Sequence, residues 1–183
     1  MYILASGSPR RKELLGLFVP EFEIVVSGCE EFVPEGTPAE KVPALLAEQK
    51  ALAVLELRPD DTVIGSDTVV VLNDEIFGKP KDKNHAHAML RALSGKKHFV
   101  YTGVAVAEKG SVRSFVQKTE VEFYELSDET IDNYIATNEP MDKAGAYGIQ
   151  GKGSVLVKGI IGDYFNVMGL PVAETARFLG IIK

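Results

Sequence analysis

The stretch SGSPRR, residues 6–11, places two arginines directly behind a short apolar run. Ser8 followed by Pro9 is typical of a helix N-cap and first helical residue, which puts Arg10 and Arg11 in the first helical turn. Cations at this positive end of a helix dipole cost roughly 0.3–1 kcal/mol each. A bound phosphate would reverse that cost, because free backbone N–H groups and guanidinium groups both bind its oxygens. The stretch therefore indicates a phosphate site, with a solvated helix end as the alternative.

A second polar group, Ser66-Asp67-Thr68, interrupts an apolar run between Thr62 and Leu72. Consecutive polar side chains in such a run need hydrogen-bond partners or a cleft, because unpaired burial is costly. Ligands of open α/β sheets bind beyond the carboxyl ends of strands. At such an end Asp67 would act as a general base or a metal ligand. An Asx turn in a break between two strands is an equally compatible interpretation.

A glycine-rich segment, DKAGAYGIQG at residues 142–151, provides a third polar group. Its glycines allow positive φ angles and close backbone approach to a ligand. Lys143 can meet a phosphate, and the Gln150 amide offers both a donor and an acceptor to the edge of a base. The segment is neither a Walker A motif nor a Rossmann fingerprint. A structural connection between a helix and a strand is the alternative.

Three further residues extend this pattern. Glu31 follows the predicted strand 22–26 and can hold a divalent cation. It forms a pair with Glu30, however, and paired acidic residues in a loop are usually solvated. Lys79 lies in a rigid Gly-Lys-Pro turn. Lys50 falls within a predicted helix, where a solvated lysine is the ordinary interpretation.

Alternating strand and helix signals predict the elements that position these groups. We expect strands at 2–5, 22–26, 62–65, 69–72, 76–77, 99–107, 112–123 and 155–161, and helices beginning at residues 8, 37, 82, 127 and 171. Helical crossovers imply parallel strand pairs, and the hairpin within 99–123 is antiparallel. The sequence therefore predicts an α/β fold with a mixed sheet, in one domain over residues 1–183 that has room for two lobes.

The composition limits the classes of protein to which this chain can belong. The 183 residues carry a net charge of −6 with no block of lysine and arginine, so stable nucleic-acid binding is not expected. No apolar stretch approaches the roughly 20 residues that cross a bilayer, so no membrane association is expected. The three histidines lack an HExxH pattern and a cysteine pair, which argues against a zinc site. The lone Cys29 excludes an internal disulfide and favours the cytoplasm.

Taken together, the motifs resemble those of the Maf family over nearly the whole chain. They occur in the family's order: SGSPRRKELL, GSDTVVVLNDEIFGKP, MLRALSGKKHFVYTGVAV, DKAGAYGIQGKG and GDYFNVMGLP. The resemblance implies a nucleoside triphosphate pyrophosphatase, which converts a triphosphate to the monophosphate and pyrophosphate. It implies a mixed twisted sheet with flanking helices and a central cleft, similar to the ITPase-like (Maf/Ham1-type) house-cleaning enzymes. DKAGAYGIQG resembles the branch that acts on dTTP, UTP and related modified pyrimidine nucleotides.

The resemblance also implies roles for individual residues. Asp67 matches the family's proton acceptor, and Arg10, Thr68 and Gln150 match positions tied to substrate selection. Ser66 departs from the alanine of many relatives, which should not abolish the chemistry. The polar residues that we expect to handle phosphate, substrate or metal are Ser6, Arg11, Glu31, Lys50, Lys79 and Lys143.

The mechanism that follows is metal-assisted hydrolysis. We expect Mg²⁺ or Mn²⁺, held by Glu31, Asp67 or both, to bridge triphosphate oxygens while Asp67 removes a proton from the water that attacks the α-phosphorus. A cation lowers the pKa of its ligand, so the sequence leaves open whether Asp67 is base, ligand or both. We also expect removal of Arg10 or Arg11 to weaken nucleotide use far more than folding.

Two alternatives stay open at the level of sequence. One is another substrate, such as 7-methyl-GTP or a different non-standard nucleotide. The other is a regulatory binding protein, because the Maf name is tied to septum formation and cell-division arrest. The presence of Asp67 and both arginines favours an enzyme. The resemblance further implies a homodimer whose small-molecule partner is the nucleoside triphosphate.

Overall fold

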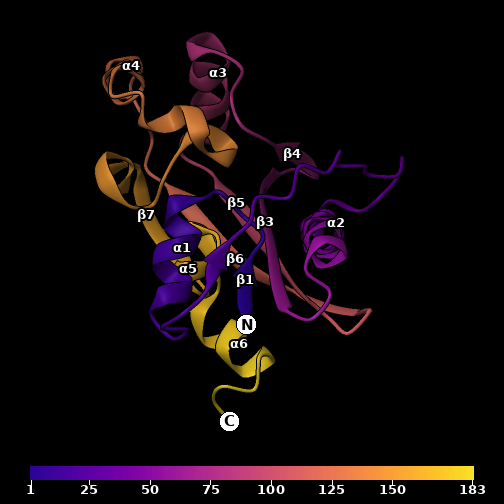
Figure 1. The fold of residues 1–183 in the computed structure, drawn as a ribbon. Coiled ribbons are helices and arrows are strands. Elements are labelled where there is room, and N and C mark those ends of the chain that lie inside the picture. The colour runs from indigo at the N-terminus through magenta and orange to yellow at the C-terminus, as the bar shows by residue number, and fades with distance from the viewer. The chain divides into compact units, whose positions relative to one another are not determined.

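The computed structural model describes the whole chain, and its residues group into two compact units. Unit 1 consists of Met1–Thr68, Thr102–Gln117 and Gly169–Lys183, and unit 2 consists of Val69–Tyr101 and Lys118–Met168. Three long strands run through both units: β3 (Thr62–Leu72), β5 (Lys97–Glu108) and β6 (Ser111–Phe123) (Figure 1). The sheet has seven strands in the order β2-β1-β3-β5-β6-β7, with β4 paired to β3.

Unit 1 contains the parallel strand pairs. β1 (Tyr2–Leu4) pairs in parallel with β2 (Glu23–Ile24) on one side and with β3 on the other. The helices of this unit are α1 (Pro9–Gly16), α2 (Val42–Leu57) and α6 (Val172–Phe178), and a 3-10 turn, η1 (Ala39–Lys41), precedes α2. α1 begins as predicted, because the Ser8 side chain accepts a hydrogen bond from the Arg11 N–H at 3.5 Å.

Two glycines let α2 lie directly on the backbone of the sheet. A Cβ at Gly65 in β3 would lie 2.1 Å from the Ala47 carbonyl oxygen, and a Cβ at Gly103 in β5 would lie 2.2 Å from the Pro43 carbonyl carbon. Side chains at either position would therefore push the helix away. Small residues such as Ala51 complete the dry contact between α2 and the sheet. This close approach brings the polar side of α2 within reach of β3.

Unit 2 contains two antiparallel strand pairs and the remaining helices. β4 (Glu75–Phe77) pairs with β3, and β7 (Val157–Ile161) pairs with β6. Asp82 and Ser127 cap α3 (Lys83–Leu93) and α4 (Asp128–Ala136) at the predicted positions, since each side chain accepts an N–H three residues further along. α3 and α4 lie side by side in Figure 1 and pack over a core that includes Phe123 and Leu156.

The predicted mixed α/β architecture is confirmed, with corrections to single elements. The glycine-rich segment is ordered as three 3-10 turns, η2 (Glu139–Asp142), η3 (Ala144–Ala146) and η4 (Gly151–Leu156), and an unpredicted helix, α5 (Tyr164–Met168), follows. The predicted break at residues 66–68 is wrong, because β3 continues through them. β2 is shorter than the predicted 22–26. No helix has the length and apolar character that a membrane span requires.

The core of unit 2 contains one histidine. His98 in β5 is 1% exposed, and its Nε2 lies 2.8 Å from the Tyr147 hydroxyl. Its ring meets Phe123 and Tyr147 edge to face, and its Nδ1 has no hydrogen-bond partner. Burial lowers the pKa of His98 to about 4, because the charged ring would lose its hydration.

This burial predicts acid-sensitive stability. Between about pH 6.5 and pH 4 the unfolded chain binds a proton at His98 that the folded protein does not, so stability falls as the pH drops through this window. The loss amounts to about 3 kcal/mol of unfolding free energy. Urea unfolding of the wild type and His98→Gln at pH 7 and pH 4.5 checks it. The difference between the two proteins is expected to shrink or reverse in acid; a difference independent of pH would contradict a neutral, buried His98.

Candidate active site

The polar residues in the middle of β3 point to opposite sides of the strand. Side chains alternate along a strand, so Gly65 and Asp67 share one side and Ser66 and Thr68 share the other. The first pair faces α2, where Gly65 meets Ala47. The second pair faces Arg11 and Gly169 through hydrogen bonds described below. All of these residues belong to unit 1, and the unbroken strand fixes their spacing.

On the α2 side, two carboxylates share one ammonium group. Lys50 Nζ lies 2.5 Å from Asp67 Oδ1 and 3.1 Å from Glu31 Oε1. The side chains of Lys50 and Asp67 are only 13% and 15% exposed, whereas that of Glu31 is 46% exposed. Lys50 is thus a paired, largely buried cation, and its interpretation as a solvated lysine is wrong. Only Oδ1 of Asp67 is engaged, which leaves Oδ2 able to accept a proton.

The neighbouring residue of α2 holds the loop that carries Glu31. The Gln49 amide donates to the Phe32 carbonyl at 2.6 Å and accepts the Phe32 N–H at 2.9 Å. Gln49 and Lys50 together therefore hold both Glu31 and the backbone next to it. Sequence reasoning missed Gln49, because a glutamine in an amphipathic helix gives no signal of a partner seventeen residues earlier.

On the other side, Arg11 connects three segments of unit 1. Its Nε donates to the Gly169 carbonyl at 2.9 Å, Nη1 to Ser6 Oγ at 3.2 Å and Nη2 to Thr68 Oγ1 at 3.1 Å. Ser66 Oγ also donates to the Gly169 carbonyl, at 3.0 Å. One N–H on each terminal nitrogen of Arg11 remains for a ligand. Arg11 is therefore both a structural crosslink and a potential anion donor.

The charges around Arg11 are coupled. Burial lowers the pKa of Arg11, the negative charge of Asp67 opposes that shift, and the positive charge of Arg10 adds to it. Glu31 also acts to raise the pKa. The two sides of β3 thus share one electrostatic environment, in which the carboxylates offset the buried guanidinium. The structure brings together the predicted residues Ser6, Arg10, Arg11, Glu31, Lys50, Asp67 and Thr68.

The other three predicted residues lie in unit 2. Lys79 is exposed, and no hydrogen bond or ion pair holds its ammonium group. The Gln150 side chain is half-buried, and its amide also has no hydrogen-bond partner. Lys143 Nζ, in contrast, donates to the Glu139 carbonyl at 2.5 Å and to Asp142 Oδ1 at 2.6 Å. Lys79 and Gln150 are available to a ligand, whereas Lys143 already binds its own turn.

The donor set of unit 1 fits a hard divalent cation. The structure contains no group of three or more His, Cys, Asp or Glu side chains that could hold a metal ion. Mg²⁺, however, commonly takes only one or two carboxylates and completes its shell with water and substrate phosphates. Glu31 and Asp67 supply two such carboxylates around Lys50. A cation held there would share these carboxylates with the Lys50 ammonium.

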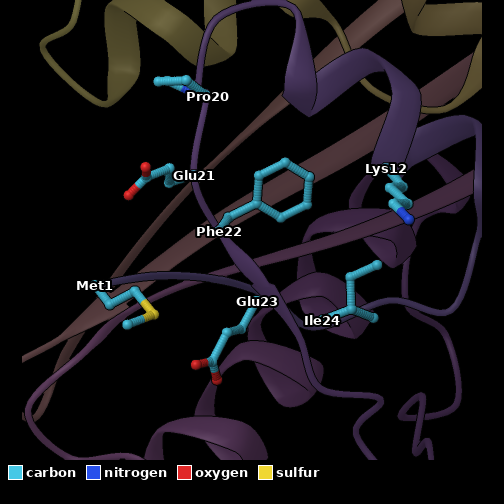
Figure 2. Close-up of a pocket in the computed structure, with 7 residues that line it drawn as sticks. All are labelled: Met1, Lys12, Pro20, Glu21, Phe22, Glu23 and Ile24. Atoms are coloured by element: carbon cyan, nitrogen blue, oxygen red, sulfur yellow. The ribbon is translucent and has the colours of Figure 1, made fainter.

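The surface of unit 1 also has an open depression of about 540 Å³ that takes no part in this arrangement. Figure 2 shows Phe22 in its middle, between Glu21 and Lys12. Met1, Pro20, Glu23 and Ile24 complete the lining, and none of the predicted site residues lies in it. The depression lacks the convergent polar groups of a nucleotide site.

Comparisons with known proteins show which proteins this chain is similar to. The family model described as "Maf-like protein" matches residues 1–181. A protein of Bacillus cytotoxicus named "dTTP/UTP pyrophosphatase" is 55% identical over 179 residues, covering 97% of this chain and 93% of that protein. A protein of Bacillus cereus (strain B4264) with the same name is 52% identical over 177 residues, with the same coverage. Among solved structures, a HAM1 protein from Coxiella burnetii superimposes with a TM-score of 0.57 at 12% identity, covering 99% of this chain and 98% of that one, and so shares the fold.

Proposed function

Because this chain belongs to the Maf family, we propose that it is a nucleoside triphosphate pyrophosphatase that hydrolyses dTTP and UTP to the monophosphate and pyrophosphate. One observation carries the proposal: Asp67 and Glu31 converge on Lys50, in the same electrostatic environment as the half-buried Arg11. Carboxylates to take a proton and hold a cation, next to fixed positive charge, are what hydrolysis of a triphosphate requires. The names of the relatives support the substrate, and the geometry supports the chemistry.

In this proposal Asp67 is the general base. Lys50 holds Oδ1 and so fixes the carboxylate, while Oδ2 accepts a proton from the water that attacks the α-phosphorus. The leaving group is pyrophosphate, whose charge grows as the bond to the α-phosphorus breaks. Arg10, the remaining N–H groups of Arg11 and Lys50 offset that charge.

A divalent cation, Mg²⁺ or Mn²⁺, belongs to the same proposal. Glu31 and Asp67 are the residues that would hold it. When bound, the cation would neutralise triphosphate oxygens and orient them for in-line displacement. Glu31, the more exposed carboxylate, is the better candidate for a purely metal-binding role, since Asp67 then keeps the basicity that proton transfer needs.

Thr68 and the unpaired groups of unit 2 are proposed to recognise the substrate. The Lys79 ammonium suits a phosphate, and the Gln150 amide, with one donor side and one acceptor side, suits the edge of a pyrimidine. The contacts of Lys143 argue for a structural role within its turn. Ser6 and Thr68 act partly through Arg11, whose terminal nitrogens they fix.

A nucleotide panel tests the proposal. Purified protein with Mg²⁺ or Mn²⁺ is incubated with dTTP, UTP, dCTP, GTP, ATP and 7-methyl-GTP, and pyrophosphate release is measured. We expect release from dTTP and UTP to exceed release from the purine nucleotides by at least tenfold in kcat/KM, with no release when chelator removes the cation. Preference for 7-methyl-GTP would contradict the substrate assignment, and inactivity on the whole panel would favour a regulatory binding protein.

We also propose that the protein acts in the cytoplasm as a homodimer. The location is supported by a lone, half-buried cysteine, Cys29, which needs no oxidising compartment. The dimer rests on the family resemblance alone. Sedimentation of the purified protein tests it, with a mass near twice 19.9 kDa expected.

A further inference from the structure

A buried tyrosine and a glutamate in unit 2 hold the segment that carries Gln150. Glu139 Oε1 accepts the Tyr134 hydroxyl and the Gly153 N–H, both at 3.0 Å. Its Oε2 accepts the Lys152 N–H at 3.0 Å. The Tyr134 hydroxyl in turn accepts the Gly148 N–H at 3.0 Å. The backbone is therefore held at residues 148, 152 and 153, on both sides of Gln150, by two side chains from outside the segment.

The glycines of this segment show how closely the two side chains approach. A Cβ at Gly153 would lie 2.7 Å from the Tyr134 hydroxyl and 2.2 Å from the Gly148 carbonyl oxygen. A Cβ at Gly151, where φ is +66°, would lie 2.8 Å from Glu139 Oε2. Glycine at these positions lets the backbone N–H groups reach the carboxylate and the hydroxyl.

Tyr134 and Glu139 are themselves held firmly and so fix the backbone of residues 148–153. Tyr134 is 4% exposed, and its ring is part of the core of unit 2. Burial acts to raise the pKa of Glu139, but hydrogen bonds from Lys152 N–H, Gly153 N–H and Tyr134 outweigh it and lower that pKa. The carboxylate is thus ionised at neutral pH, and an ionised acceptor makes the stronger hydrogen bonds.

Gln150 lies in the middle of the supported segment and makes no side-chain hydrogen bond of its own. A flexible amide discriminates poorly between donor and acceptor edges, because it can turn to suit either one. To distinguish one base edge from another, the backbone must fix the position and the direction of the Gln150 side chain. The support from residues 134 and 139 supplies that constraint, with Ile149, 8% exposed, anchoring the segment between them.

We propose that Tyr134 and Glu139 are positioning residues that orient Gln150 and so determine how well the enzyme distinguishes pyrimidine bases by their hydrogen-bonding edge. The inference rests on the proposed function, in which Gln150 contacts the base. The proposal requires no contact between the nucleotide and either positioning residue. They act through the backbone of residues 148–153.

Glu139→Gln tests this with a change of one atom. Glutamine has a single acceptor oxygen for three converging donors, so its NH₂ group faces at least one backbone N–H and that hydrogen bond is lost. We expect the ratio of kcat/KM for dTTP over dCTP to fall at least fivefold, mainly through KM. Tyr134→Phe, which removes only the hydroxyl, is expected to lower the same ratio. It tests the proposal on its own if Glu139→Gln folds poorly. Glu129→Gln and Tyr124→Phe, at exposed positions of the same unit, are the matched controls.

The ratio separates positioning from mere destabilisation, because a smaller folded fraction lowers kcat/KM for both nucleotides equally. Gln150→Ala is measured beside the two variants. If Gln150→Ala changes the ratio and neither support variant does, the inference is overturned while the proposed function stands. If Gln150→Ala leaves the ratio unchanged, Gln150 does not recognise the base, and the inference is overturned as well. If the wild type releases no pyrophosphate, the proposed function fails, and calorimetric binding of dTTP and dCTP gives the same ratio without turnover.

Discussion

Asp67→Asn is expected to lower kcat for pyrophosphate release from dTTP by about 10²–10⁴-fold, the usual contribution of a general base. Asparagine keeps the shape of the side chain, but its amide does not accept the proton of the attacking water. Lys50 retains Glu31 as a partner, so the buried ammonium is not left unpaired. We therefore expect the variant to fold, with an urea midpoint close to that of the wild type.

Steady-state kinetics with dTTP, together with circular dichroism, checks this result. Asp60→Asn, an exposed aspartate of the same unit, is the matched control and should keep full activity. Turnover of folded Asp67→Asn within about threefold of the wild type would remove Asp67 from the role of base. A metal titration separates its two possible roles: recovery of the rate at high Mn²⁺ would identify Asp67 as a metal ligand, whereas a rate that stays low at saturating metal supports the base.

Arg11→Ala is expected to damage both stability and activity. The substitution removes the donors to Ser6 and Thr68, and it leaves the Gly169 carbonyl with Ser66 as its donor. Hydrogen bonds from a charged donor contribute about 1.5–3 kcal/mol each, and partial relaxation brings the expected loss of unfolding free energy to about 3 kcal/mol. The kcat/KM for dTTP should fall at least 100-fold, because the remaining N–H groups for phosphate are lost as well.

Urea unfolding at pH 7 and kinetics at a temperature where the variant is folded measure the two effects separately. Lys12→Ala, the exposed next residue of α1, is the control and should change neither by much. Unfolding free energy equal to that of the wild type would show that the three hydrogen bonds of Arg11 are dispensable for folding. The structure thus changes the expectation from sequence, in which loss of Arg11 spared the fold.

Signals confined to a few residues predicted the local structure well. Ser8-Pro9, Asp82 and Ser127 predict helix starts. The side chains of Ser8, Asp82 and Ser127 each accept the N–H three residues further on, as a cap requires. Asn73 and Asp74, both at positive φ, form a tight turn in the gap between the predicted strands 69–72 and 76–77. These features succeed because the residues that cause them are neighbours in the chain.

Features that depend on distant partners could not be predicted in this way. Three polar residues in an apolar run predict a break between two strands, yet they continue β3, because Lys50, Arg11 and the Gly169 carbonyl satisfy them from two sides. The residues that hold the loop next to Glu31 and the segment 148–153 in place were missed for the same reason. Gln49, Tyr134 and Glu139 carry no motif, and their importance lies entirely in backbone groups that they meet elsewhere in the chain.

The route of the chain also limits how this protein can be divided. Each unit is built from separate stretches of sequence, and the chain passes between them at residues 68–69, 101–102, 117–118 and 168–169. No gene fragment with a single new end therefore encodes one unit without part of the other. Recombination can exchange surface loops of this protein. The chain, however, has no two boundaries between which one continuous stretch would transplant a whole unit.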